Sequence, residues 1–118
     1  MKIKYLATGS APIYSISGET INGVDLSPLE HGGEFVGNDD TRVQSIRDAE
    51  RDASGELWVI LCQAVGPGHW EESDWIDASA YDPNAIYVTY LDKKHSGKPW
   101  AVTARGKVDP RNGEVIDV

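Results

Sequence analysis

The residue types best suited to binding chemistry gather in the acid- and tryptophan-rich segment 69–82. Several carboxylates close together can ligate a hard cation such as calcium. Exposed Trp rings can stack on sugar rings or anchor a protein interface. The candidate binding residues are Trp70, Glu71, Glu72, Asp74, Trp75 and Asp77.

The same segment also fits a purely structural role. Its acids do not follow the spacing of a calcium loop, in which acids alternate around a central Gly. Large apolar residues are scarce elsewhere, because Phe35 is the only Phe in the chain. Trp and Tyr must therefore fill much of the core. We favour a solvated loop whose Trp70 and Trp75 pack inward, with ligand binding as the competing interpretation.

No pattern typical of catalysis or of a resident metal occurs in the chain. His31, His69 and His95 each lack a second His two to four residues away, and one cysteine is too few for a structural zinc site. Cys62 lies in an apolar run, which predicts a buried, inert thiol. The Gly-Pro-Gly at 66–68 lacks the Lys of a phosphate loop. We predict no catalytic residue, no metal and no cofactor, and hence a protein that is not an enzyme. A hydrolase of unknown type, whose pocket would include His31 or His69, stays open as a third hypothesis.

The net charge of −8 is unevenly distributed. Residues 52–92 include eight acids and no Lys or Arg, whereas residues 93–118 hold six basic residues and three acids. An acidic surface suits a basic protein partner. It disfavours nucleic acid, whose phosphates need clustered Lys and Arg. Contact between the acidic window of one copy and the basic tail of another would be salt-sensitive, and the oligomeric state stays open.

Neither a secretion signal nor a membrane span is expected. The N-terminal apolar stretch is short and is interrupted by Lys2 and Lys4. The longest apolar run, 57–65, is far below the roughly 20 residues that span a bilayer. The length of 118 residues and the absence of a linker or repeat predict one soluble domain over 1–118.

Three polar breaks between β-prone runs carry turn chemistry. Asn22-Gly23 is typical of a two-residue hairpin turn. Segments 52–55 and 109–113 each place a Gly three or four residues after an Asp, which suits a type I turn closed by a left-handed Gly. The expected fold class is mainly β, with α+β left open. We expect a single small antiparallel sheet or a barrel-like meander of hairpins, with at most one or two short helices.

Strand patterns recur along the chain. They fall at 2–8, 57–62, 86–91 and 100–108. Alternation in the first places Ile3, Tyr5 and Ala7 on one face. The second is continuously apolar, which predicts a central strand covered on both faces.

Three further segments are less distinct. Residues 41–51 have helical spacing but run into a turn and a strand, so we favour a strand over 46–51 and leave a helical turn open before it. Ser73 could cap a short helix over 74–80. A brief edge strand is expected at 34–36.

Several strings resemble small uncharacterised proteins encoded in bacteriophages and prophages, often near tail genes. They are Leu26-Ser-Pro-Leu-Glu-His-Gly-Gly-Glu-Phe-Val-Gly-Asn-Asp, Asp48-Ala-Glu-Arg-Asp, Gly55-Glu-Leu, Leu61-Cys-Gln, Ser73-Asp-Trp-Ile-Asp and Tyr81-Asp-Pro. The resemblance covers roughly residues 1–90. It implies a phage or prophage origin, and hence a location in the cytoplasm of a bacterial host or in the virion. The resemblance implies no activity and no site residue.

These observations favour a non-enzymatic phage or prophage accessory or structural protein that acts through protein–protein contacts, with tail association as the narrower hypothesis. The alternative is a small module that binds a glycan or calcium through segment 69–82.

Overall fold

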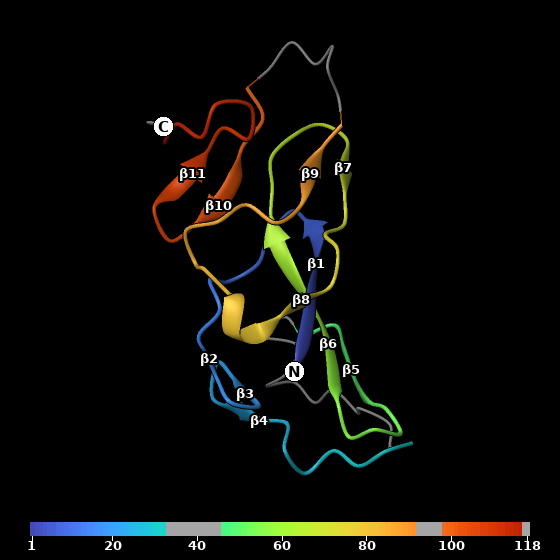
Figure 1. Cartoon of the computed structure of the whole chain (residues 1–118). Helices are drawn as coiled ribbons and strands as arrows, with labels where there is room; N and C mark the ends of the chain where they lie inside the picture. The colour runs from blue at the N-terminus through green and yellow to red at the C-terminus, as the bar shows by residue number, and fades with distance from the viewer. Residues whose placement is uncertain (33–45, 92–97, 117–118) are drawn as a thin grey trace.

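The computed structural model describes residues 1–32, 46–91 and 98–116, and this part of the chain is mainly β, as predicted (Figure 1). The elements are β1 (Lys2–Thr8), β2 (Ile16–Ser17), β3 (Thr20–Ile21), β4 (Val24–Asp25), β5 (Asp48–Arg51), β6 (Leu57–Ala64), β7 (Trp70–Glu71), β8 (Ile76–Asp77), the 3-10 turn η1 (Ala78–Ala80), β9 (Thr89–Tyr90), β10 (Ala101–Thr103) and β11 (Gly106–Val108). No helix among these residues has the length and apolar character needed to cross a bilayer.

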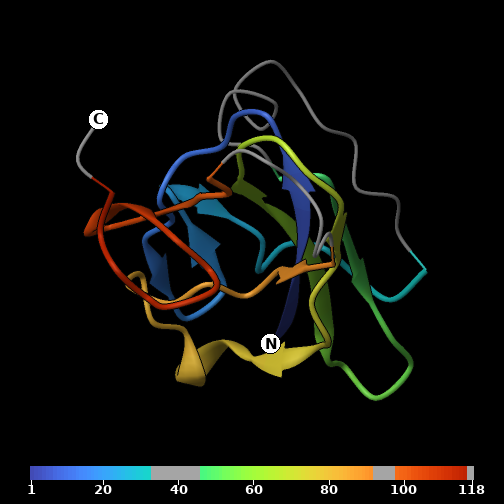
Figure 2. The same cartoon turned by 90° about the horizontal axis from the view of Figure 1, so that it is seen from above.

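The largest sheet has the strand order β5-β6-β1-β8 and is mixed rather than antiparallel. β1 and β6 run parallel in register from Lys2 opposite Trp58 to Thr8 opposite Ala64. They lie side by side in both views (Figures 1 and 2). β5 and β8 flank this pair in antiparallel orientation. The described strands thus form four small sheets, not one meander, because β1 pairs with a distant strand instead of with its successor.

Alternation along β1 and β6 gives the large sheet an inner and an outer face. Ile3, Tyr5, Val59 and Leu61 are buried on the inner face, where they join the main hydrophobic cluster. The residues of β6 that alternate with them and point to the outer face, Trp58 and Ile60, are only half-buried. The predicted central strand is confirmed, but it is covered on both faces only from residues 61 to 64. The first half of β6, residues 57–60, therefore has an outer face that is accessible to solvent.

Local turn chemistry shapes the predicted hairpins. Asn22 and Gly23 have φ angles of 49° and 83° and join paired residues Ile21 and Val24, which is the geometry of a two-residue hairpin. The 52–55 turn links β5 to β6, and Gly55 takes a φ of 91° there. The strand expected over 46–51 is confirmed as β5, while the expectations for 34–36 and 41–45 lie outside the described residues.

The helix expected over 74–80 is wrong. Ser73 does not cap it, because its hydroxyl accepts a 2.8 Å hydrogen bond from the Tyr5 amide and its own amide donates to the Tyr5 carbonyl. These bonds hold the segment extended along β1, so it enters β8. Only η1 follows, and Asp77 caps it through the Ser79 amide.

Two other predicted strands are shorter than expected. Of 86–91, only Thr89–Tyr90 forms a strand. The span 100–108 folds back on itself, because a turn at 104–105 separates β10 from β11 and Gly106 has a φ of 109°. The predicted turn at 109–113 is present, and its Asp109 carboxylate accepts a 2.8 Å bond from the Arg111 amide.

Candidate binding site on the outer sheet face

A recess of about 400 Å³ lies on the outer face of the large sheet, over β5 and β6. It is lined by Asp48, Glu50, Asp52, Trp58, Ile60 and Trp75. Its volume is in the range of small-ligand sites, and it combines indole rings with carboxylates. We refer to it as the Trp58–Trp75 recess.

Strand register explains how these side chains meet. In the antiparallel β5–β6 pair, Glu50 is opposite Trp58 and Asp48 is opposite Ile60. Cross-strand partners share a face, so two acids of β5 flank two apolar residues of β6. On the other side of β6, Lys2 of β1 is opposite Trp58. The outer face therefore changes from acidic at β5 to basic at β1.

The two tryptophans form an edge-to-face pair at the recess. The ring centroids of Trp58 and Trp75 are 5.1 Å apart, with planes at 89°. Trp75 is 38% exposed. The Lys4 ammonium lies 5.1 Å from the Trp75 centroid and 3.2 Å from the Glu72 carboxylate.

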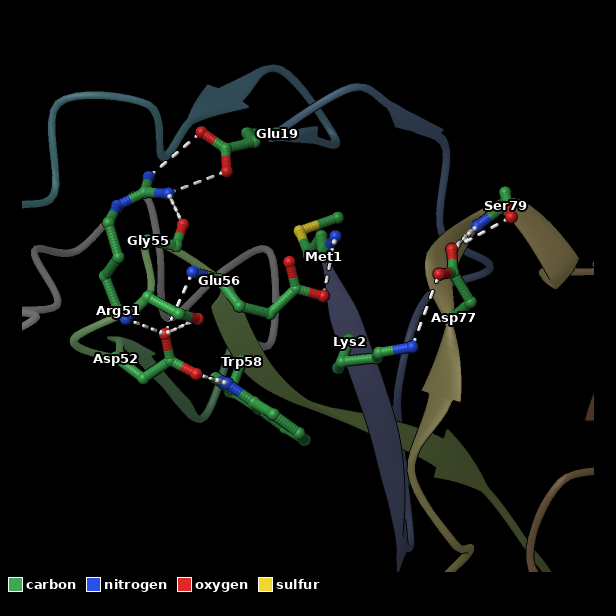
Figure 3. Close-up of polar contacts among 11 residues, drawn as sticks. Met1, Lys2, Glu19, Arg51, Asp52, Gly55, Glu56, Trp58, Asp77 and Ser79 are labelled. Carbon is green, nitrogen blue, oxygen red and sulfur yellow. Dashed lines mark hydrogen bonds and ion pairs between the residues drawn. The ribbon is translucent and has the colours of Figure 1, made fainter.

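Asp52 fixes the orientation of Trp58 (Figure 3). One carboxylate oxygen accepts a 2.8 Å bond from the Trp58 indole, and the other accepts from the Ser54 amide and hydroxyl and from the Glu56 amide. Hydrogen bonds, first from the Ser54 hydroxyl and then from the indole, lower the pKa of Asp52 to about 2. The carboxylate is therefore ionised at neutral pH and is already engaged by the protein.

Arg51 anchors the same turn to the β2-β3-β4 sheet (Figure 3). Its guanidinium makes two 2.9 Å bonds to the Glu19 carboxylate and donates to the carbonyls of Gly55 and Leu29. The bond from Arg51 lowers the pKa of Glu19. Because the Arg51 side chain is only 14% exposed, this bidentate pair gives the recess a fixed wall rather than a mobile one.

Asp48 and Glu50 differ from Asp52. Both residues are exposed, and neither carboxylate makes a hydrogen bond or ion pair within the described part of the chain. They are two residues apart on β5, so both carboxylates face the recess. These are the acids of the recess that are available to a ligand.

The structure disperses the six residues that the sequence singled out. Trp75 alone among them lines the recess, and because its ring is 38% exposed the inward packing predicted for it is wrong. Trp70 is half-buried, donates to the Gly66 carbonyl and packs on Tyr90 at 5.0 Å, so for this ring the predicted inward packing is confirmed.

The predicted acids point elsewhere. Glu72 pairs with Lys4. Asp77 pairs with Lys2 at 3.4 Å and caps η1 (Figure 3). Glu71 and Asp74 are exposed outside the recess. Within the described residues, no group of three or more His, Cys, Asp or Glu could hold a metal ion.

Sequence reasoning missed Asp48, Glu50, Asp52, Trp58 and Ile60. A usable signal was present: acids alternate with Ala49 in β5, and the 52–55 turn joins that segment directly to the strand that carries Trp58. Aligning the two arms of that hairpin would have placed the acids beside the indole.

The predicted buried thiol is confirmed, because Cys62 is 2% exposed. A second cavity near it, of about 20 Å³, lies among Tyr5, Tyr14, Tyr81 and Tyr87. It has room for no more than about one water molecule. Burial raises the pKa of Tyr5 and of Tyr14, so these phenols stay neutral and serve packing.

Comparison with protein-family models, with curated proteins and with solved structures found no match to this chain.

Proposed function

We propose that this protein is a non-catalytic binding protein that contacts a partner protein through the Trp58–Trp75 recess. The observation that carries the proposal is the exposed Trp75 ring packed edge-to-face on the half-buried Trp58 indole, which Asp52 holds in place, beside two available carboxylates. Trp is enriched at the energetic centres of protein interfaces, and rigid anchors lose little entropy on binding.

Charge supports a basic partner. The chain carries a net charge of −8, and two of its acids, Asp48 and Glu50, lie on the β5 side of the recess. Complementary charge accelerates encounter and selects against acidic partners. A phage or prophage origin, a tail-associated role and a location in the host cytoplasm or virion remain part of the proposal on the strength of the sequence strings alone.

A glycan is the second candidate ligand, favoured by one observation: the 38% exposed Trp75 ring lies beside carboxylates that can accept bonds from hydroxyl groups. A thermal-shift screen against simple sugars tests it. A Tm rise that Trp75→Ala abolishes would favour the glycan over the protein partner.

The test of the main proposal is crosslinked capture from the cells in which the protein occurs, using wild-type bait and Trp75→Ala. The matched control is Leu91→Ala, which removes an exposed apolar side chain (51% exposed) that does not line the recess. We expect a partner captured by wild type and by Leu91→Ala but lost with Trp75→Ala. Equal capture by all three baits would contradict the proposal.

A further inference from the structure

We infer that the Trp58–Trp75 recess receives a cationic side chain with an apolar stem, the guanidinium of an Arg or the ammonium of a Lys on the partner protein. This inference rests on the proposed function and specifies the chemistry that the recess recognises.

The first argument is the imbalance of charge across the outer face. The basic residues on the β1 side are already neutralised, because Lys2 pairs with Asp77 and Lys4 pairs with Glu72. Asp48 and Glu50 on the β5 side have no such partner among the described residues. A bound cation would supply the missing positive charge where the recess is open.

The second argument is distance. Residues two apart on a strand are separated by roughly 7 Å, so Asp48 and Glu50 can flank one cationic group from either side. Asp52 adds a third negative charge at the same wall, although both of its oxygens already accept hydrogen bonds within the turn. Asp52 therefore adds to the negative electrostatic potential at the recess and does not contact the ligand directly.

The third argument is the floor of the recess. Trp58 and Ile60 present apolar surface beside the acids, and long cationic side chains pack their methylene stems on such surface. An indole face also attracts a cation directly. A long cationic side chain could thus pack its stem on the apolar floor while its charged group contacts an indole ring and the carboxylates.

The chain itself contains the same combination. The Lys4 ammonium is bound between the Trp75 ring and the Glu72 carboxylate, and the Lys107 ammonium lies 4.2 Å from the Trp100 centroid. The first contact shows that the Trp75 indole at the recess holds an ammonium group beside a carboxylate, and the second shows an ammonium group over an indole elsewhere in the chain.

Competing ligands fit less well. An anion would meet three carboxylates at the recess. A neutral sugar would use the indole rings but would leave the Asp48 and Glu50 carboxylates without a countercharge. The chemistry therefore points to a cation and predicts that its binding weakens with salt.

The probes that test this are blocked tripeptides with a central Arg, Lys or citrulline, of which citrulline is the uncharged analogue of Arg. Binding is followed by NMR through the four indole N–H signals, with Trp70 and Trp100 as internal references. We expect the Arg and Lys peptides to shift the Trp58 and Trp75 signals with a Kd on the order of millimolar, and citrulline to cause no saturable shift.

The matched variants are Asp48→Asn/Glu50→Gln and the control Glu71→Gln/Asp74→Asn, which changes the net charge equally at exposed acids outside the recess. The first should weaken binding of the Arg peptide about fivefold or more, and the second should leave it nearly unchanged. All four positions are exposed, and the remaining spectrum checks that each variant is folded.

Equal shifts with citrulline and Arg, or equal weakening by the two double variants, would overturn the inference. So would the absence of any shift at tens of millimolar peptide. In each case the proposed function would still stand if capture of the partner depended on Trp75, so the two failures are distinguishable.

Discussion

Gln63 supplies the sharpest test of how the fold is held together. It lies in β6, is 7% exposed, and makes four hydrogen bonds to main-chain groups of two other segments. Its carbonyl accepts from the Tyr87 amide at 2.8 Å and the Val88 amide at 3.3 Å. Its amide donates to the Ala85 carbonyl at 3.0 Å and the Val102 carbonyl at 3.3 Å. One side chain thus joins residues 85–88 and β10 to the central sheet.

The perturbation is Gln63→Met, which keeps the approximate length and volume of the side chain and removes all four bonds. A buried polar group left without a partner costs about 1–3 kcal/mol. Counting the two shorter bonds at about 1 kcal/mol each and the two longer bonds at about half of that gives a loss of about 3 kcal/mol. Met fills the space of Gln, so the cavity contribution is small.

The assay is urea unfolding followed by tryptophan fluorescence. A lower midpoint at an unchanged m-value would report lost stability. Leu91→Met is the control, because it introduces the same side chain at an exposed position. Amide exchange at residues 87 and 88 should also accelerate in Gln63→Met. A free energy of unfolding within about 0.5 kcal/mol of wild type, with unchanged exchange, would refute the assigned role of Gln63.

Three further tests address other contacts within the fold. Tyr14→Phe should cost about 1–3 kcal/mol in urea unfolding, because its hydroxyl accepts a 3.0 Å bond from a buried β6 amide. Tyr5→Phe should be neutral or stabilising, since its buried hydroxyl has no hydrogen-bond partner among the described residues. The reverse order of the two variants would contradict this. Acid titration should lower the stability of the fold as the pH falls from about 4 towards 2, because the folded-state pKa of Asp52 is lowered to about 2. Asp52→Asn should flatten that part of a plot of Tm against pH. An unchanged plot would count against the hydrogen-bond network of the turn. Gly66→Ala should shift the Trp100 indole signal and lower the Tm, because an added Cβ would overlap that ring. An unaltered signal would disprove the close approach of Gly66 to Trp100.

The sequence predicted the parts of the fold that local chemistry determines. Asn22-Gly23 forms the expected hairpin because both residues take positive φ angles within a two-residue turn. It could not predict which strands lie side by side. The parallel pairing of β1 with β6 joins residues more than 50 positions apart, and both patterns would suit an antiparallel neighbour equally well.

The candidate site was only partly predictable for a related reason. Trp75 was singled out for its neighbours in the sequence, but its neighbours in the recess come from β5, the turn that follows it and β6. Continuous apolarity in 57–62 concealed the outward position of Trp58. Conversely, Glu72 and Asp77 were grouped with Trp75 although the lysines of β1 engage them, which no local pattern indicated.

The most direct measurement of the central claim is hydroxyl-radical footprinting of the four tryptophans, with and without the captured partner. We expect oxidation of Trp58 and Trp75 to fall in the complex, while Trp70 and Trp100, which do not line the recess, keep their rates. Unchanged rates at Trp58 and Trp75 in a formed complex, or protection confined to Trp70 or Trp100, would contradict binding through the outer face of the sheet.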